Sequence, residues 1–430
     1  MHSKLSTNRL YFLLDYGIAF LAICFIIQDL LQNYIPIFQY LDEIASVFFF
    51  SFYIVSLIKR KKIKQSELYI IILTATVIFV GIISNLTSGV NRPTAAILMD
   101  IGNTFKFVLI YLGLIYASQK LLNKKVLKII IVFVKFYLLV LLVCATINLF
   151  TDIGMYYDIR YGLRAFSFIY GIPGVIINHC TYSLVIFIAD KSINNKNNTI
   201  FIIISLLLMA STLRSRAFGL IALFCLMYYF FFIAKRKEIK SYIFLTIIII
   251  TIIGASQIET YFIDNTNSVR ATFLRYSFYI AKKYFPLGTG FSSYGSFAAA
   301  TYYSPLYYLF GFNNKYGMGP DQNLFLSDNY WPTILGEFGV IGFIVFVALI
   351  FKYFQSLYYH ICKNKNNESK FIYTFVLLDI LMSSIQSSYI SHYSMIALIF
   401  ITMLCFNNNY HNKKDTEPND NRIKRTARKR

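Results

Sequence analysis

Charged residues are scarce in this sequence. Asp, Glu, Lys and Arg make up 14% of its 430 residues, whereas 57% are hydrophobic and 18% are aromatic. A soluble domain carries about a quarter charged residues, so this composition excludes an ordinary water-soluble protein. Several apolar runs approach the ~20 residues with which a helix crosses a ~30 Å hydrocarbon core. The sequence therefore predicts an all-α polytopic membrane protein.

Acidic residues are fewer still, with 20 Asp and Glu against 41 Lys and Arg and a net charge of +21. This excess does not indicate nucleic-acid binding, because it is divided into short blocks between apolar runs. The blocks lie at 59–62, 120–128, 235–237 and 422–430. Such blocks are typical of the cytoplasmic loops of membrane proteins, and the last one can contact anionic headgroups. We expect membrane lipids, and no nucleic acid, as partners.

Paired cysteines and a signal peptide are also lacking. None of the six cysteines has the spacing of a metal site, and five lie in apolar runs. We therefore expect no disulfide and no structural zinc. The first apolar run, 10–31, is too long for a signal core and has no small-residue cleavage site. It predicts a first transmembrane helix instead.

Apolar runs and basic blocks together predict twelve spans with both termini in the cytoplasm. An odd number of spans would place either the basic tail or the other basic blocks outside. The predicted spans are 10–31, 36–58, 67–87, 97–118, 129–150, 172–190, 199–213, 217–234, 241–256, 333–355, 371–389 and 392–406. Residues 1–406 then form one transmembrane domain, and 407–430 form a disordered, basic cytoplasmic tail.

The predicted outer side carries basic residues that oppose the positive-inside trend. They fall in the segment 151–171, in the turn 211–216 and in one large outside loop, about 257–332. Arginine's planar, permanently charged fork suits phosphate, so these segments predict a site for a lipid phosphate. For the pair at the turn, snorkelling to headgroups is the alternative. The residues concerned are Arg160, Arg164, Arg214, Arg216, Arg270, Arg275, Lys282 and Lys283.

The large loop begins with a predicted amphipathic helix from Ser268 to Phe285, ended by Pro286. Arg275, Tyr279 and Lys282 are spaced to share one face of it. This helix either presents a basic stripe over the membrane or is a plain surface helix. The sequence Gly288-Thr289-Gly290 after it predicts a tight turn that returns the chain to the membrane.

Two carboxylates follow the loop. Asp328 is either a general base or the N-cap of the next helix. Glu337, about one turn into that helix and near the outer surface, is either an acid–base group or an ion-pair partner of Arg275 or Arg216. Within the predicted spans, the polar residues Asp100, Lys106, Lys135 and His179 bind polar groups in the bundle, lie near helix ends or relay protons.

Three short motifs resemble those of the O-antigen polymerase/ligase superfamily. Arg275 followed by Pro286-Leu287-Gly288-Thr289-Gly290 resembles the family's Arg-x(n)-Pro-x-Gly-x-Gly pattern. Asp328-Asn329 through Leu335-Gly336-Glu337-Phe338-Gly339 resembles its next block, a polar pair before Leu-x-Glu-x-Gly. Ser215-Arg216, at the opening of a helix, is similar to its Ser-Arg element. The resemblance is clearest over residues 200–350.

The resemblance implies a GT-C-like helical fold, without metal or other cofactor, in the cytoplasmic membrane. It implies transfer of a glycan from undecaprenyl diphosphate at the outer face, with Arg216 and Arg275 holding the diphosphate. The acceptor would be a second lipid-linked oligosaccharide, and a flippase and a chain-length regulator would be protein partners. We expect the substrate to be bound further by Arg214, Arg270, Lys282, Tyr279, Arg160, Arg164 and Glu337.

The ligase branch of the family has His-Asn where this chain has Asp328-Asn329. The difference favours a polymerase of O-antigen, capsule or exopolysaccharide, with Asp328 as the candidate base. An O-antigen ligase type of transferase is the first alternative. A lipid-linked oligosaccharide flippase or other transporter is the second, and it would predict internal repeats and a charged central cavity. The sequence has no evident repeat.

Overall fold

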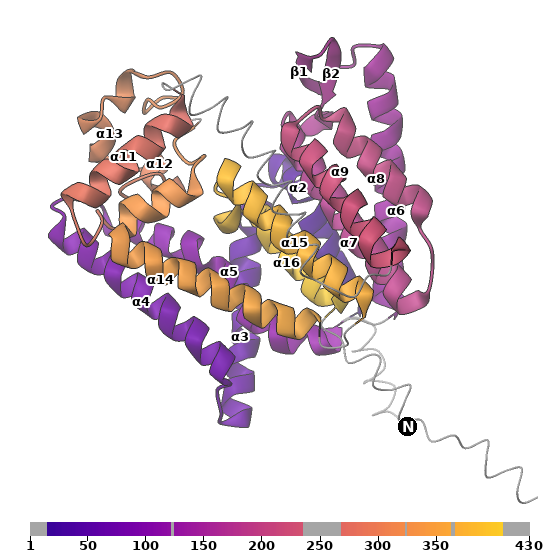
Figure 1. Cartoon of the computed structure of the whole chain (residues 1–430), viewed down its shortest axis with the longest axis horizontal. Coiled ribbons are helices and arrows are strands. Elements are labelled where there is room, and N and C mark those ends of the chain that lie inside the picture. Colours follow the sequence, from indigo (N-terminus) through magenta and orange to yellow (C-terminus); the bar gives the residue numbers. More distant parts are fainter. Residues whose placement is uncertain (1–14, 122–123, 235–267, 323–324, 363–365, 407–430) are drawn as a thin grey trace, which may run out of the picture.

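The computed structural model describes residues 15–121, 124–234, 268–322, 325–362 and 366–406 (Figure 1). The predicted span 241–256 and the predicted tail 407–430 lie outside these ranges. The described chain is mostly helical, and its only strands are those of the small hairpin β1 (Tyr156–Arg160) and β2 (Leu163–Phe166). Among the described residues, seven helices are long and apolar enough to cross a membrane. The prediction of a helical polytopic membrane protein is confirmed at this level.

The first predicted span is not one straight helix. The helix Asp15–Ile26 and α2 (Gln28–Tyr34) meet at an angle of 83°. The break at Ile27 places the buried polar residues Gln28 and Asp29 in the second piece, where they find partners. The Gln28 amide donates to the carbonyl of Phe38 at 3.1 Å. The expected continuous helix over 10–31 is therefore wrong over its described part.

The other N-terminal helices follow the predicted spans closely. Apolar runs set their lengths, and the basic residues Lys59 and Arg60 stand at the last turn of one of them, where they complement the helix dipole. These elements are η1 (Pro36–Tyr40), α3 (Leu41–Arg60), α4 (Gln65–Thr87), α5 (Thr94–Leu121) and α6 (Lys124–Phe150).

The elements after the hairpin pack around one central helix, α7 (Pro173–Asn194). Outside the predicted large loop, the described elements are η2 (Phe168–Tyr170), α7, α8 (Thr199–Ser211), α9 (Ser215–Tyr228), η3 (Tyr229–Ile233), α14 (Tyr330–Ile361), α15 (Asn367–Gln386), η6 (Tyr389–Ser391) and α16 (Tyr393–Phe406). In α7, 94% of the most apolar window is buried by other elements. α8 and α16 are shorter than a full span, and α15 is not among the seven apolar helices. The expected number of twelve spans thus stays a prediction.

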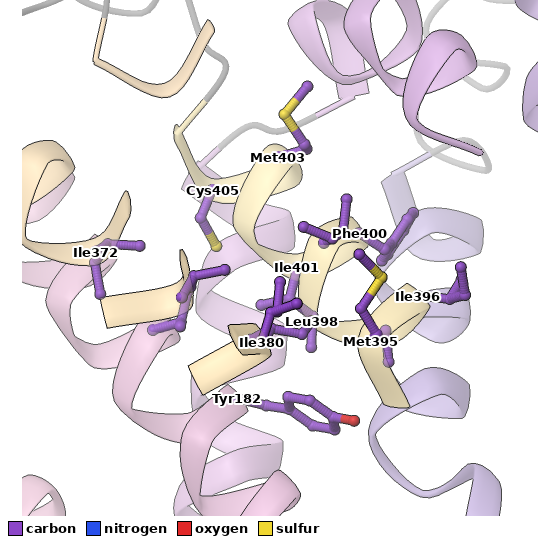
Figure 2. Close-up of a cluster of buried hydrophobic side chains, with 14 of the residues drawn as sticks. Tyr182, Ile372, Ile380, Met395, Ile396, Leu398, Phe400, Ile401, Met403 and Cys405 are labelled. Carbon is purple, nitrogen blue, oxygen red and sulfur yellow. The ribbon is translucent and has the colours of Figure 1, made fainter. Parts of the chain in front are cut away.

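The helix α16 is buried along its whole length, which explains why a short helix can be so apolar. Figure 2 shows its side chains, among them Met395, Phe400 and Met403, in one cluster with Tyr182 of α7 and Ile380 of α15. Burial of such side chains stabilises a soluble core by about 1.5–3 kcal/mol each. In a bilayer, close packing supplies the stabilisation instead.

The described part of the predicted large loop, residues 268–322 and 325–329, is folded. It contains α11 (Val269–Lys283), α12 (Phe297–Thr301), α13 (Pro305–Leu309) and η5 (Phe312–Asn314). Phe273, Ile280 and Tyr294 form a hydrophobic cluster there with Tyr307 and Phe312, separate from the main core. Figure 1 shows this unit at one end of α4 and α14. It is a small packed unit because its aromatic side chains bury one another.

Candidate functional site

Arg216 lies where several helices meet. It is the second residue of α9, and its side chain is only 12% exposed. Its Nη2 donates to Asn178 Oδ1 of α7 at 2.8 Å and to Asp379 Oδ1 of α15 at 3.0 Å. Its guanidinium carbon lies 5.0 Å from the ring centroid of Tyr389. The guanidinium is therefore held in one orientation by three separate elements.

The groups around Arg216 are linked to one another. Asp379 also accepts a hydrogen bond from Ser383 Oγ at 3.1 Å. Asn178 Nδ2 donates to Ser394 Oγ at 3.0 Å, and His392 Nδ1 lies 3.0 Å from the same hydroxyl. The Nε of Arg216 is buried and has no hydrogen-bond partner. The Nε–H of this fixed guanidinium is thus available to donate a hydrogen bond to a bound ligand.

Helix geometry adds positive potential at this position. Arg216 is the second residue of α9, and Ser394 is the second residue of α16. The first backbone N–H groups of a helix lack intrahelical acceptors and carry a partial positive charge. The two helix N-termini are joined through Asn178, so they converge near the guanidinium. Such an arrangement suits an anion, although Asp379 offsets part of the charge.

The residues on either side of Asp328 contact the chain just before Tyr389, the residue whose ring lies against Arg216. Ser388, which precedes Tyr389, donates from its hydroxyl to the carbonyl of Ser327. Trp331 Nε1 donates to Ser384 Oγ at 3.1 Å, near the end of α15. The segment around Asp328 therefore lies against the same stretch, 384–389, that carries the aromatic ring on Arg216. Residues 53 and 61 positions apart in the sequence become neighbours here.

The carboxylate of Asp328 is not a helix cap. The N-cap of α14 is Asn329, and it makes no side-chain capping bond, so the capping alternative is wrong. Burial raises the pKa of Asp328 above its ordinary value, and the nearby cation Arg270 opposes the rise. This places Arg270, at the start of α11, within electrostatic reach of Asp328.

The predicted basic stripe lies on the exposed face of α11. Ser268 caps the helix by accepting from the N–H of Ala271 at 3.2 Å. Arg275, Tyr279 and Lys282 are exposed, while Phe273 and Ile280 face the hydrophobic cluster of the loop unit. Within the described residues no contact joins Arg275 to Arg216. The pKa of Lys315 is lowered by its burial and, to a smaller extent, by the positive charge of the nearby Arg275.

The other predicted arginines gather at the β-hairpin. Asp158 accepts from Arg160 Nε at 2.9 Å and pairs with Arg214 Nη2 at 3.5 Å. Arg164 Nη1 donates to the carbonyl of Asn148 at 3.4 Å. Figure 1 shows the hairpin and α11 at opposite sides of the same end of the molecule. The predicted site residues thus fall into separate groups.

The sequence predicts Glu337 near the outer surface, either as an acid–base group or in an ion pair with Arg275 or Arg216. The structure shows neither the surface position nor the ion pair. Glu337 is 1% exposed. Its Oε1 accepts from the N–H groups of Ser293 and Tyr294 at 3.1 and 3.2 Å and from Ser296 Oγ at 2.9 Å. Glu337 therefore holds the folded loop against α14. Its predicted role in substrate binding stays a prediction.

The motif Gly288-Thr289-Gly290 packs against a break in α14. Thr289 N donates to the Gly336 carbonyl at 3.0 Å, and Gly290 N donates to the Glu337 carbonyl at 2.7 Å. Gly339, with φ +64°, interrupts the helix there. A Cβ at Gly288 would overlap the Glu337 carbonyl, and one at Gly339 would overlap Leu287. The glycines serve close backbone packing, which is more than the simple turn that the sequence predicts.

Sequence reasoning missed several residues of the Arg216 cluster, namely Asn178, Asp379, Tyr389 and His392. Asp379 could have been found from the sequence, because it is the only charged residue in the two predicted spans 371–389 and 392–406. A charged residue within a predicted span indicates a functional role. The rest are ordinary polar residues whose roles depend on packing.

A further buried network links Asp29 to His179 and Tyr393. His179 Nε2 lies 3.3 Å from Asp29 Oδ2, and the Tyr393 hydroxyl donates to the same carboxylate. Lys106 pairs with Asp42 and Glu43. The predicted polar residues Lys106 and His179 therefore bind polar groups within the bundle.

The arrangement combines a fixed guanidinium and converging helix ends with a half-buried carboxylate, Asp328, on a segment that packs against residues 384–388. The guanidinium can bind an anion, and the carboxylate is a group able to accept a proton. Comparison with models of known protein families finds no match, and comparison with curated proteins finds none either.

Proposed function

We propose that this chain is a membrane glycosyltransferase that joins oligosaccharide units carried on undecaprenyl diphosphate. The single observation that carries the proposal is the environment of Arg216. Its guanidinium is held by Asn178 and Asp379, its Nε is without a partner, and two helix N-termini converge beside it. A leaving diphosphate is an anion that such preorganised donors stabilise as its charge develops.

The proposed reaction takes place at the outer face of the cytoplasmic membrane, on a chain with twelve spans. The hydroxyl of the acceptor sugar attacks the anomeric carbon of the donor, and the bond from that carbon to the diphosphate oxygen breaks. Asp328 takes the hydroxyl proton. Arg275 assists from the exposed face of α11, where Arg270, Tyr279 and Lys282 meet the glycan or headgroup.

The test compares Arg216→Lys with Arg216→Ala. Lysine keeps the charge but loses the fork, so we expect polymer from Arg216→Lys to fall at least tenfold. Arg216→Ala should abolish polymer. The readout is mass analysis of lipid-linked glycans from cells, with protein quantified in the membrane fraction. Lys283→Ala, on the exposed surface of α11, is the matched control and should make normal polymer.

The outcome pattern separates the candidate functions. Accumulated single repeat units at the outer face support the polymerase. Long chains that are not transferred to another acceptor support the ligase alternative. Full-length polymer made by Arg216→Ala would overturn the assignment of Arg216 to the site.

A transporter of lipid-linked oligosaccharides is the second candidate, and the broken first helix favours it. Interrupted helices with buried charges line the substrate sites of many transporters. Here the break at Ile27 precedes Asp29, which is bound to His179 and Tyr393. Repeat units trapped on the cytoplasmic side after Asp29→Asn, with normal polymerisation of units supplied from outside, would favour this candidate.

A further inference from the structure

A cavity of about 170 Å³ opens between α6, β2, α8 and the turn that follows α8. Its walls are mostly apolar and include Leu142, Ala145 and Leu208. Leu149 and Leu207, which also line it, are 50% and 57% exposed at the apolar surface of the helices. The cavity is therefore accessible to a hydrocarbon chain from the surrounding membrane.

Arg164 is the only charged residue that lines this cavity. Its neighbours Arg160 and Arg214 are held by Asp158, whereas Arg164 has no carboxylate within ion-pair distance in the described chain. Its guanidinium contacts the carbonyl of Asn148 and the ring face of Tyr156, whose centroid is 6.0 Å away. It stands half-buried at the cavity with its charge uncompensated.

Asn148 provides an independent indication of a ligand. It is 1% exposed and lines the same cavity, and its Oδ1 is buried without any hydrogen-bond partner. A buried acceptor without a donor costs free energy. A hydroxyl group on a bound molecule would satisfy it. The cavity thus offers apolar walls, one cation and one unfilled acceptor.

We propose that this cavity is a binding site for an anionic phospholipid of the bilayer, with an acyl chain between α6 and α8 and the phosphate on Arg164. One guanidinium matches the single negative charge of a phosphodiester, whereas a diphosphate carries more charge than one cation balances. A headgroup with hydroxyls supplies the donor for Asn148. This site is independent of the glycosyl-transfer function proposed for Arg216.

The test uses the purified full-length protein in detergent and native mass spectrometry with added phosphatidylglycerol or phosphatidylcholine. We expect Arg164→Gln to weaken phosphatidylglycerol binding about fivefold, the factor that corresponds to ~1 kcal/mol for one cation near a lipid headgroup. Binding of phosphatidylcholine should not change. Arg160→Gln is the matched control and should leave both lipids unaffected.

A second variant, Ala145→Phe, fills the cavity and should weaken binding of both lipids. Equal phosphatidylglycerol binding by the wild-type protein and either Arg164→Gln or Ala145→Phe would overturn the proposal. Displacement of phosphatidylglycerol by millimolar inorganic phosphate would also overturn it, because the site would then recognise a free anion. Displacement by a lower concentration of farnesyl diphosphate would assign the cavity to a prenyl substrate instead.

Discussion

At the scale of single residues, burial separates groups that the sequence places in one class. Arg216 is enclosed and held by Asn178 and Asp379, whereas Arg275 is exposed on α11. Both are arginines on predicted outer segments, but only the first is fixed. A fixed guanidinium stabilises charge without reorganising. An exposed one is screened by water and salt.

The pKa of Asp328 leads to a pH prediction. A general base acts when ionised, so the rate rises with pH through its pKa and then levels off. Because burial raises this pKa, we expect the rise above the ordinary carboxyl value of about 3.9. Asp328→Asn should lower the rate and remove the rise. Polymerisation of purified lipid-linked repeats, measured across pH, is the readout.

Arg270 provides the internal control for that profile. Its positive charge lowers the pKa of Asp328, so Arg270→Ala should move the rise to still higher pH. An unchanged profile in Asp328→Asn would show that another group is the base.

Glu337 is expected to matter for folding rather than for substrate. Glu337→Ala leaves the buried N–H groups of Ser293 and Tyr294 without their acceptor, at a cost of ~1–3 kcal/mol each. Glu337→Gln keeps an acceptor oxygen and should be much milder. Thermal unfolding in detergent distinguishes the two variants. Equal destabilisation by both would mean that the charge, and not the acceptor, is what the loop needs.

At the scale of elements, the decisive feature is the contact between the folded loop and the break in α14. Phe291 N donates to Asn85 Oδ1 at 2.8 Å, which ties the same segment to α4. The segment 286–296 is therefore clamped between two long helices. Its position sets where the C-terminal end of α11 lies and how the basic face of that helix is presented.

Gly339 tests this contact. Its φ is +64°, and an added Cβ would overlap the backbone of Leu287. Gly311 has a similar φ of +66° but no atom within 4 Å of an added Cβ. Both alanine variants carry the conformational strain, and only Gly339→Ala adds overpacking, worth about 1–3 kcal/mol. We expect Gly339→Ala to be the less stable by that margin in thermal unfolding. Equal stabilities would show that α14 and the loop separate without cost.

At the scale of the whole molecule, the central question is which side of the membrane carries the loop unit. The positive-inside pattern predicts the outer side. Ser293 lies in the middle of the loop in the sequence, but it is fully buried. A label must therefore be placed elsewhere, and Asn314 is exposed.

A cysteine introduced by Asn314→Cys in a cysteine-free background should react with a membrane-impermeant maleimide in intact cells. The background is needed because native Cys225 is exposed in the described chain. A cysteine at Lys61, on the predicted cytoplasmic side, should react only after permeabilisation. The reverse result would overturn the orientation and, with it, a reaction at the outer face.

The sequence by itself determined the helical, membrane-embedded class and most helix boundaries, because apolar length and end charges act locally along the chain. It also identified the amphipathic face of α11, since a periodic pattern needs no distant partner. Only the tertiary structure decided that the first span is broken and that Glu337 is buried and accepts hydrogen bonds from the folded loop. It also decided that Asn178, Asp379 and Tyr389 surround Arg216. Those features depend on partners far away in the sequence, and burial and hydrogen bonding are settled only where the helices pack together.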